Sequence, residues 1–175
     1  MKRSIISAAV LSSVFMSAGA FAVDYDSGVL KINGKVVGTT CQFVGSNTAE
    51  ISLNEIGKDK LSDLQAGAVY TDVMNSTQIP LKIKCDPDKV PRITFSSTQF
   101  DSNNITYNNG TATGVGFAVY YGDSTEKVNP QDGVELDSNS EGLYDLNFSA
   151  RYARLAGEVA AGDVNSTLTL TVVTD

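Results

Sequence analysis

Hydrophobic and polar residues alternate along much of this chain, and the alternation is clearest at its C-terminal end. In residues 165–175, Leu168, Leu170 and Val172 alternate with threonines. A period of two residues is typical of a strand that buries one face. The printed sequence ends with this strand, so we expect one of its hydrogen-bonding edges to remain open.

The same alternation predicts further short strands in the rest of the chain. In the segment that ends at Cys85, for example, Leu81, Ile83 and Cys85 share one face and Lys82 and Lys84 the other. Glycine, asparagine and proline turn signals separate such segments. The predicted strands are residues 28–37, 50–53, 78–85, 92–96, 114–121, 133–136 and 143–152. Many short strands at this spacing favour an all-β fold, an antiparallel β-sandwich.

Two segments suggest helix. Residues 58–65 are predicted to form a helical turn at the surface. Residues 149–159 have a helix-friendly composition, but Phe148, Ala150 and Tyr152 keep the period of two. We therefore expect a strand that ends near Arg154, followed by a loop.

The N-terminus has the pattern of a secretory signal peptide. Lys2 and Arg3 precede the apolar residues 5–16, and Ala20–Ala22 matches a cleavage site. We expect residues 1–22 to be removed and the mature chain to begin at Val23. The apolar run is too short for a membrane anchor and no later stretch is apolar enough, so no membrane insertion is expected. The remaining 153 of the 175 residues suffice for one domain.

The charge of the mature chain limits its partners. Without Lys2 and Arg3, 11 basic and 20 acidic residues remain, a net charge of −9. Nucleic acid and anionic lipid are therefore not expected as partners.

The chain offers little material for catalysis or metal binding. Cys41 and Cys85 both lie in the exported part, where a disulfide is favoured. The disulfide would stabilise the fold by about 3 to 4 kcal/mol. The chain contains no histidine, which excludes Ser-His-Asp triads and the usual zinc sites. Asp86 and Asp88 are interpreted as solvated turn carboxylates, so we predict no enzyme, cofactor or metal.

Four further segments follow one another along the chain: Gly28–Cys41, Ile51–Ile56, Ile79–Cys85 and Phe148–Tyr152. The last is the run Phe-Ser-Ala-Arg-Tyr, about twenty residues before the C-terminus. In this order the four segments resemble the pilin subunits of chaperone–usher fimbriae, closest to the type 1 and P pilus major subunits.

The resemblance implies an immunoglobulin-like sandwich that lacks its last strand and is completed by a donor strand from a neighbouring subunit. Residues 23–34 would form the donor extension and residues 35–175 the pilin domain. Lys31 and Asn33 would then face water. The inward donor residues would be Gly28, Leu30, Ile32 and Gly34.

The resemblance also implies partners. The terminal strand, with Leu168, Leu170, Val172 and the carboxylate of Asp175, would bind a periplasmic chaperone before it accepts a donor strand. Thr174 stands where the family usually has a penultimate tyrosine. Further partners would be an outer-membrane usher, other copies of the chain and other pilin subunits, with a host receptor as an additional candidate. The subunit would pass through the periplasm to a fimbria on the cell surface.

Other readings remain open at this point. Leu30 and Ile32 also fit the first strand of a complete, self-contained sandwich. The chain also fits a minor, adapter or adhesive pilin, or a freestanding exported module that binds a ligand. Tyr120 and Tyr121, if exposed, would suit contacts with a sugar, but two adjacent tyrosines in a strand are more often one core and one surface residue, which is the reading we prefer.

Overall fold

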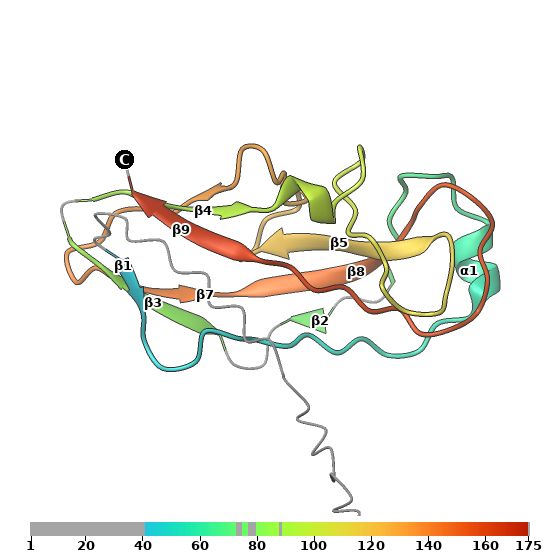
Figure 1. Ribbon diagram of the computed structural model, residues 1–175, viewed down its shortest axis with the longest axis horizontal. Coiled ribbons are helices and arrows are strands. Elements are labelled where there is room, and N and C mark those ends of the chain that lie inside the picture. Colours follow the sequence, from blue (N-terminus) through green and yellow to red (C-terminus); the bar gives the residue numbers. More distant parts are fainter. Residues whose placement is uncertain (1–40, 73–74, 77–79, 88, 175) are drawn as a thin grey trace, which may run out of the picture. The chain divides into compact units, whose positions relative to one another are not determined.

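Strands dominate the computed structural model, which describes residues 41–72, 75–76, 80–87 and 89–174 (Figure 1). The strands are β1 (Cys41–Phe43), β2 (Asn75–Ser76), β3 (Leu81–Cys85), β4 (Pro91–Phe95), β5 (Val115–Tyr121), β6 (Val134–Glu135), β7 (Leu143–Leu146), β8 (Phe148–Arg154) and β9 (Leu170–Thr174). A short α-helix, α1 (Lys58–Ser62), and a 3₁₀-helix, η1 (Ser97–Gln99), complete the described elements. The predicted all-β fold is confirmed.

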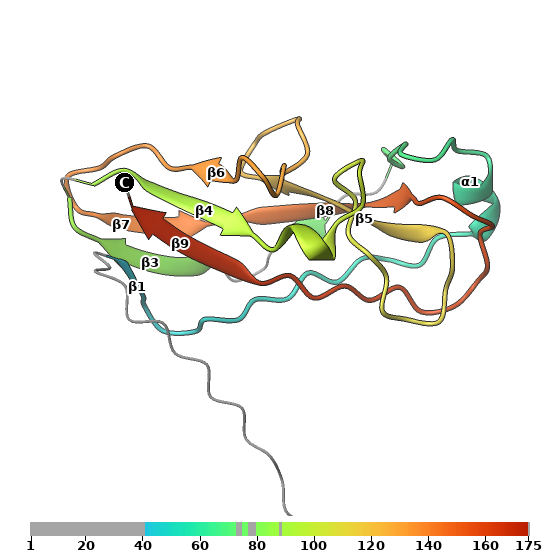
Figure 2. The same ribbon diagram turned by 45° about the horizontal axis from the view of Figure 1, so that its top comes forward.

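All strand pairs in the described residues are antiparallel, and there they form three small sheets with the orders β1-β3-β7, β2-β8-β5 and β6-β4-β9. Only Asn147 separates β7 from β8, so the first two sheets are continuous along the chain. Figure 2 shows β9 beside β4 at the edge of the third sheet. This edge position of β9 matters for the site described below.

The main hydrophobic core contains side chains from both the β3-β7 and the β4-β9 pairs, as expected for a sandwich. Ile83, Ile93 and Leu146 are completely buried. The ring of Phe95 packs edge-on against Phe100 and Phe148, with centroid distances of 6.2 and 5.9 Å. Burying each large apolar side chain contributes roughly 1.5 to 3 kcal/mol.

Several sequence predictions are confirmed. In β3, Leu81, Ile83 and Cys85 are buried while Lys82 and Lys84 are exposed. The strand with the Phe148, Ala150 and Tyr152 face ends at Arg154. The predicted helical turn is α1, and Cys41 forms a disulfide with Cys85 across β1 and β3.

Other predictions need correction. Residues 50–53 are not part of a strand, and the terminal strand begins at Leu170 rather than at Asn165. Both segments border a groove that no strand of the described chain fills, so a ladder partner is missing there. The predicted strand 143–152 is divided at the exposed Asn147, whose carbonyl instead accepts a hydrogen bond from the Gly122 N–H at 2.9 Å.

Tyr120 does not fit an exposed sugar site. Its side chain is only 6% exposed, and the guanidinium of Arg151 lies 5.5 Å from the centre of its ring. Tyr121 is half-buried and packs against the core. In the described residues we find no helix long and apolar enough to cross a membrane.

Candidate functional site: a groove beside an open strand edge

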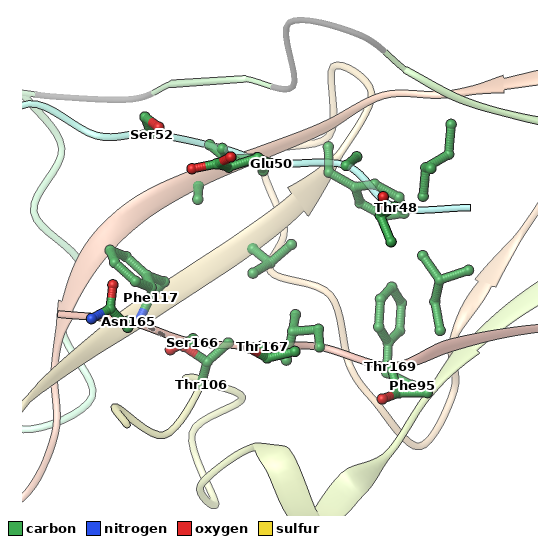
Figure 3. Close-up of a pocket in the computed structure, with 18 of the residues that line it drawn as sticks. Thr48, Glu50, Ser52, Phe95, Thr106, Phe117, Asn165, Ser166, Thr167 and Thr169 are labelled. Carbon is green, nitrogen blue, oxygen red and sulfur yellow. Dashed lines mark hydrogen bonds between the residues drawn. The ribbon is translucent and has the colours of Figure 1, made fainter. Parts of the chain in front are cut away.

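A groove with a volume of about 1150 Å³ runs along the sandwich (Figure 3). Two extended segments border it: residues 47–53, here called the first wall, and residues 164–170, here called the second wall. The second wall leads directly into β9. The groove therefore lies beside the extended segment that precedes β9 and reaches the first residue of that strand, Leu170.

Strands β5 and β8 supply the floor of the groove. Phe117 is opposite Tyr152, and Val119 is opposite Ala150. The ring centroids of Phe117 and Tyr152 are 5.3 Å apart. On the other side of the Val119 pair, the ring centroids of Tyr121 and Phe148 are 5.4 Å apart. The small Val119 and Ala150 pair thus lies between two aromatic pairs.

The side chains of the second wall alternate strictly. Leu168, Leu170 and Val172 are half-buried and pack against the main core, while the threonines between them are exposed. Val164 packs against the second core cluster, with Tyr152. The predicted face of Leu168, Leu170 and Val172 therefore exists, but it is only partly covered. Asp175 lies outside the described residues.

The backbone of the second wall is bonded on one side. The N–H of Asn165 donates to Asn108 Oδ1 at 2.7 Å, and the C=O of Asn165 accepts from the Asn109 N–H at 2.7 Å. Thr167 and Thr169 are bonded toward the same side. Consecutive residues of an extended chain direct their N–H and C=O groups to opposite edges. Within the described chain, we find no hydrogen bond to the backbone groups of Val164, Ser166 or Leu168, which form the open edge.

The first wall is held mainly by side chains of other segments. The Asn75 side-chain amide donates to the Ser52 carbonyl, and Tyr152 Oη donates to the Asn54 carbonyl at 3.1 Å. Ile51 and Leu53 are half-buried against the cores, and Phe43, at one end of the groove, is 36% exposed. Apolar side chains on both walls, and Phe117 on the floor, are thus only partly covered.

The groove carries little charge. Glu50 is the one carboxylate among its lining residues, and none of the described lining residues is basic. Burial raises the pKa of the Tyr152 phenol, and the nearby charge of Glu55 raises it further. The floor therefore stays uncharged well above neutral pH, which suits an apolar occupant.

The sequence analysis identified only part of this site. The floor residues Phe117 and Val119 belong to a segment that was predicted as a strand. Nothing in its alternation indicates that this strand lies under a groove. The predicted donor residues Gly28, Leu30, Ile32 and Gly34 lie outside the described residues, so their role stays a prediction. In the part of the chain that the structure describes, no group of three or more histidine, cysteine or acidic residues is placed to hold a metal ion.

Comparisons with known proteins agree with this architecture. Residues 30–174 match the family model of the fimbrial protein. The chain is 34% identical to the uncharacterized fimbrial-like protein YehD of Escherichia coli K12, over the full length of both chains. It is also 27% identical to the fimbrial subunit type 1 of Salmonella typhimurium, over 97% of each chain.

The fold also has a solved counterpart. A chain in the structure of a chaperone-usher pilus superposes with a TM-score of 0.57 at 17% identity, covering 87% of this chain and 98% of that one. Together with the family match, this likeness confirms the resemblance to fimbrial pilins that the four sequence segments indicated. The chain belongs to the fimbrial protein family and is a pilin, a subunit of a surface fimbria.

Proposed function

We propose that this pilin is a structural subunit of a fimbrial shaft and that it polymerises by donor-strand exchange. The observation that carries the proposal is the groove beside the second wall, where an apolar floor and an open backbone edge lie together. An exposed edge of this kind is a site for strand addition. The proposed occupant is residues 23–34 of a second copy of the chain.

The spacing of the donor residues fits the floor. Inward-facing residues of a strand recur every two residues, about 6.6 Å apart. The floor pairs Phe117–Tyr152 and Val119–Ala150 have the same spacing of two residues. Leu30 and Ile32, flanked by Gly28 and Gly34, supply apolar side chains at this interval.

The energetics favour a durable contact. Burial of Leu30 and of Ile32 contributes roughly 1.5 to 3 kcal/mol each. Each new backbone hydrogen bond to the open edge adds about 1 kcal/mol. The half-exposed Leu168, Leu170 and Val172 would also be covered, which adds apolar area on the acceptor side.

The geometry of such a contact leads to a filament. The donor segment and the groove are different surfaces, so the contact is heterologous and repeats without closing. A groove with neither a basic residue nor a metal-binding cluster among its described residues offers no chemistry for catalysis. Membership of the fimbrial protein family supports a structural role rather than an enzymatic one.

Before assembly the open edge needs protection. We propose that a periplasmic chaperone pairs with β9 and contacts the Asp175 carboxylate, and that an outer-membrane usher then exchanges the chaperone for the next donor strand. The match to the fimbrial subunit type 1 of Salmonella typhimurium over nearly its whole length supports a shaft subunit.

The test uses the mature chain, purified with and without a co-expressed fimbrial chaperone, and a synthetic peptide of residues 23–37. We expect a chain that is folded but only weakly stable alone, forms a one-to-one complex with the chaperone, and becomes a much more heat-resistant monomer with the peptide. A stable monomer whose melting temperature ignores the peptide would overturn the proposal and would instead indicate a complete, freestanding sandwich.

A further inference from the structure

The second wall keeps a strand-like conformation, although in the described chain no strand pairs with its outer side, the side opposite the open edge. Strand β4 ends at Phe95 and the chain then turns into η1. The wall nevertheless continues the alternation of exposed and half-buried residues from β9 back to Asp163. Some other part of the molecule must therefore satisfy the outer backbone groups of residues 163–169.

The side chain of Gln99 supplies two of these bonds. Its Nε2 donates to the Thr167 carbonyl at 2.8 Å, and its Oε1 accepts from the Thr169 N–H at 2.8 Å. These are the two groups, on either side of Leu168, that one residue of a parallel neighbouring strand would use. The carboxamide thus replaces one residue of a missing strand.

Asn108 has the same role further along the wall. Its Oδ1 accepts from the Asn165 N–H at 2.7 Å, and its Nδ2 lies 3.3 Å from the Asp163 carbonyl. The same amide is fixed in place because it also donates to the Ala112 carbonyl at 2.7 Å and accepts from the Gly110 N–H at 2.8 Å.

A chain of hydroxyl groups connects the wall to the floor. The Phe117 N–H donates to Thr106 Oγ1 at 3.0 Å, and Thr106 is completely buried. Thr106 Oγ1 lies 2.8 Å from Ser166 Oγ, which donates to the Tyr107 carbonyl at 2.7 Å. The Thr106 hydroxyl therefore donates to Ser166, and the middle of the wall is linked to β5.

We propose that Gln99 and Asn108 are positioning residues that hold the second wall extended while the groove is empty, so that the open edge of Val164, Ser166 and Leu168 is preformed for an incoming strand. This inference rests on the proposed function of the groove. Without the two amides, the incoming strand would have to order the wall as it binds. Preorganisation of this kind improves binding by removing that ordering cost.

The first experiment measures how fast a fluorescent peptide of residues 23–37 associates with the mature chain and with its Gln99→Met variant. Methionine keeps the size of the side chain and removes both hydrogen bonds. The association rate constant should fall roughly tenfold, as two lost hydrogen bonds imply. The matched control is Gln131→Met, because Gln131 is exposed and its side chain makes no hydrogen bond among the described residues; its rate should equal that of the parent. Equal rates for all three proteins would overturn the inference.

The second experiment needs no peptide. Amide hydrogen exchange of the empty chain should show protection of the Thr169 N–H, and Gln99→Met should remove it while Ala150, inside the β5-β8 pair, stays protected. Fast exchange at Thr169 in the parent would overturn the inference. If the parent does not bind the peptide but shows this exchange pattern, the proposed function is wrong. The role of Gln99 in holding the second wall would still be supported.

Discussion

Strands β8 and β9 have similar alternating sequences and very different surroundings. β8 lies between β2 and β5, and Phe148, Ala150 and Tyr152 on its apolar face are at most 8% exposed. β9 has β4 on one side only, and Leu170 and Val172 stay half-exposed. The same period of two thus occurs in a strand that is paired on both edges, here called finished, and in one that is paired on a single edge, here called unfinished. The neighbouring strands, and not the alternation, decide between the two.

The largest expected effect comes from the strand proposed to finish β9. Replacement of both Leu30 and Ile32 by Asp should abolish polymer formation, because two carboxylates would have to enter an apolar groove. The acceptor groove is unchanged in this variant, so binding to the chaperone should persist. Electron microscopy and size-exclusion chromatography measure the outcome. Normal polymers from the double variant would contradict the assignment of the donor strand.

A matched pair of truncations tests the contrast between finished and unfinished strands directly. Leu146→Ala removes a completely buried side chain and should lower the free energy of unfolding by about 3 to 5 kcal/mol. Leu170→Ala removes a half-exposed one and should cost only about 1 kcal/mol in the empty chain. Denaturant titration measures both values.

The peptide of residues 23–37 provides the control for this pair. Once the groove is filled, Leu170 is covered, so the cost of Leu170→Ala should rise toward that of Leu146→Ala. A cost that is the same with and without the peptide would mean that the peptide does not cover this part of β9.

The smallest effect concerns the link between the floor and the first wall. The folded state favours the neutral Tyr152 phenol, since burial and the charge of Glu55 raise its pKa. The hydrogen bond to the Asn54 carbonyl should therefore make the parent about 1 kcal/mol more stable than Tyr152→Phe below pH 10. This advantage should disappear as the pH rises through the raised pKa of the folded state. A difference that stays constant in alkaline melting curves would argue against the bond.

Alternation correctly predicted a buried face in β3 and in β8, where Phe148, Ala150 and Tyr152 are buried. It did not predict that β8 buries Ser149 and Ala153 on its other face as well. The pattern does not show whether a neighbouring strand exists, which is why residues 50–53 were predicted as a strand. Asn147 could not be recognised as a break, since the residues on either side keep the same period.

The positioning residues were beyond the reach of sequence analysis for a different reason. Gln99 is separated from Thr167 by 68 positions, and Asn108 from Asn165 by 57. A glutamine after a strand and an asparagine in a turn are common, and neither has a local pattern that indicates its partner. Only the fold brings these amides alongside the second wall.

The disulfide has a mechanical consequence. In the proposed filament, tension enters each subunit through the segment that leads into Cys41. Among the described residues, the ladder between β1 and β3 pairs Cys41, Gln42 and Phe43 with Cys85, Lys84 and Ile83. The Cys41–Cys85 bond joins the first of these described pairs. In the proposed filament the pulling force would therefore pass through a covalent bond into β3 and the centre of the sandwich, and would not depend on the hydrogen bonds of β1 alone.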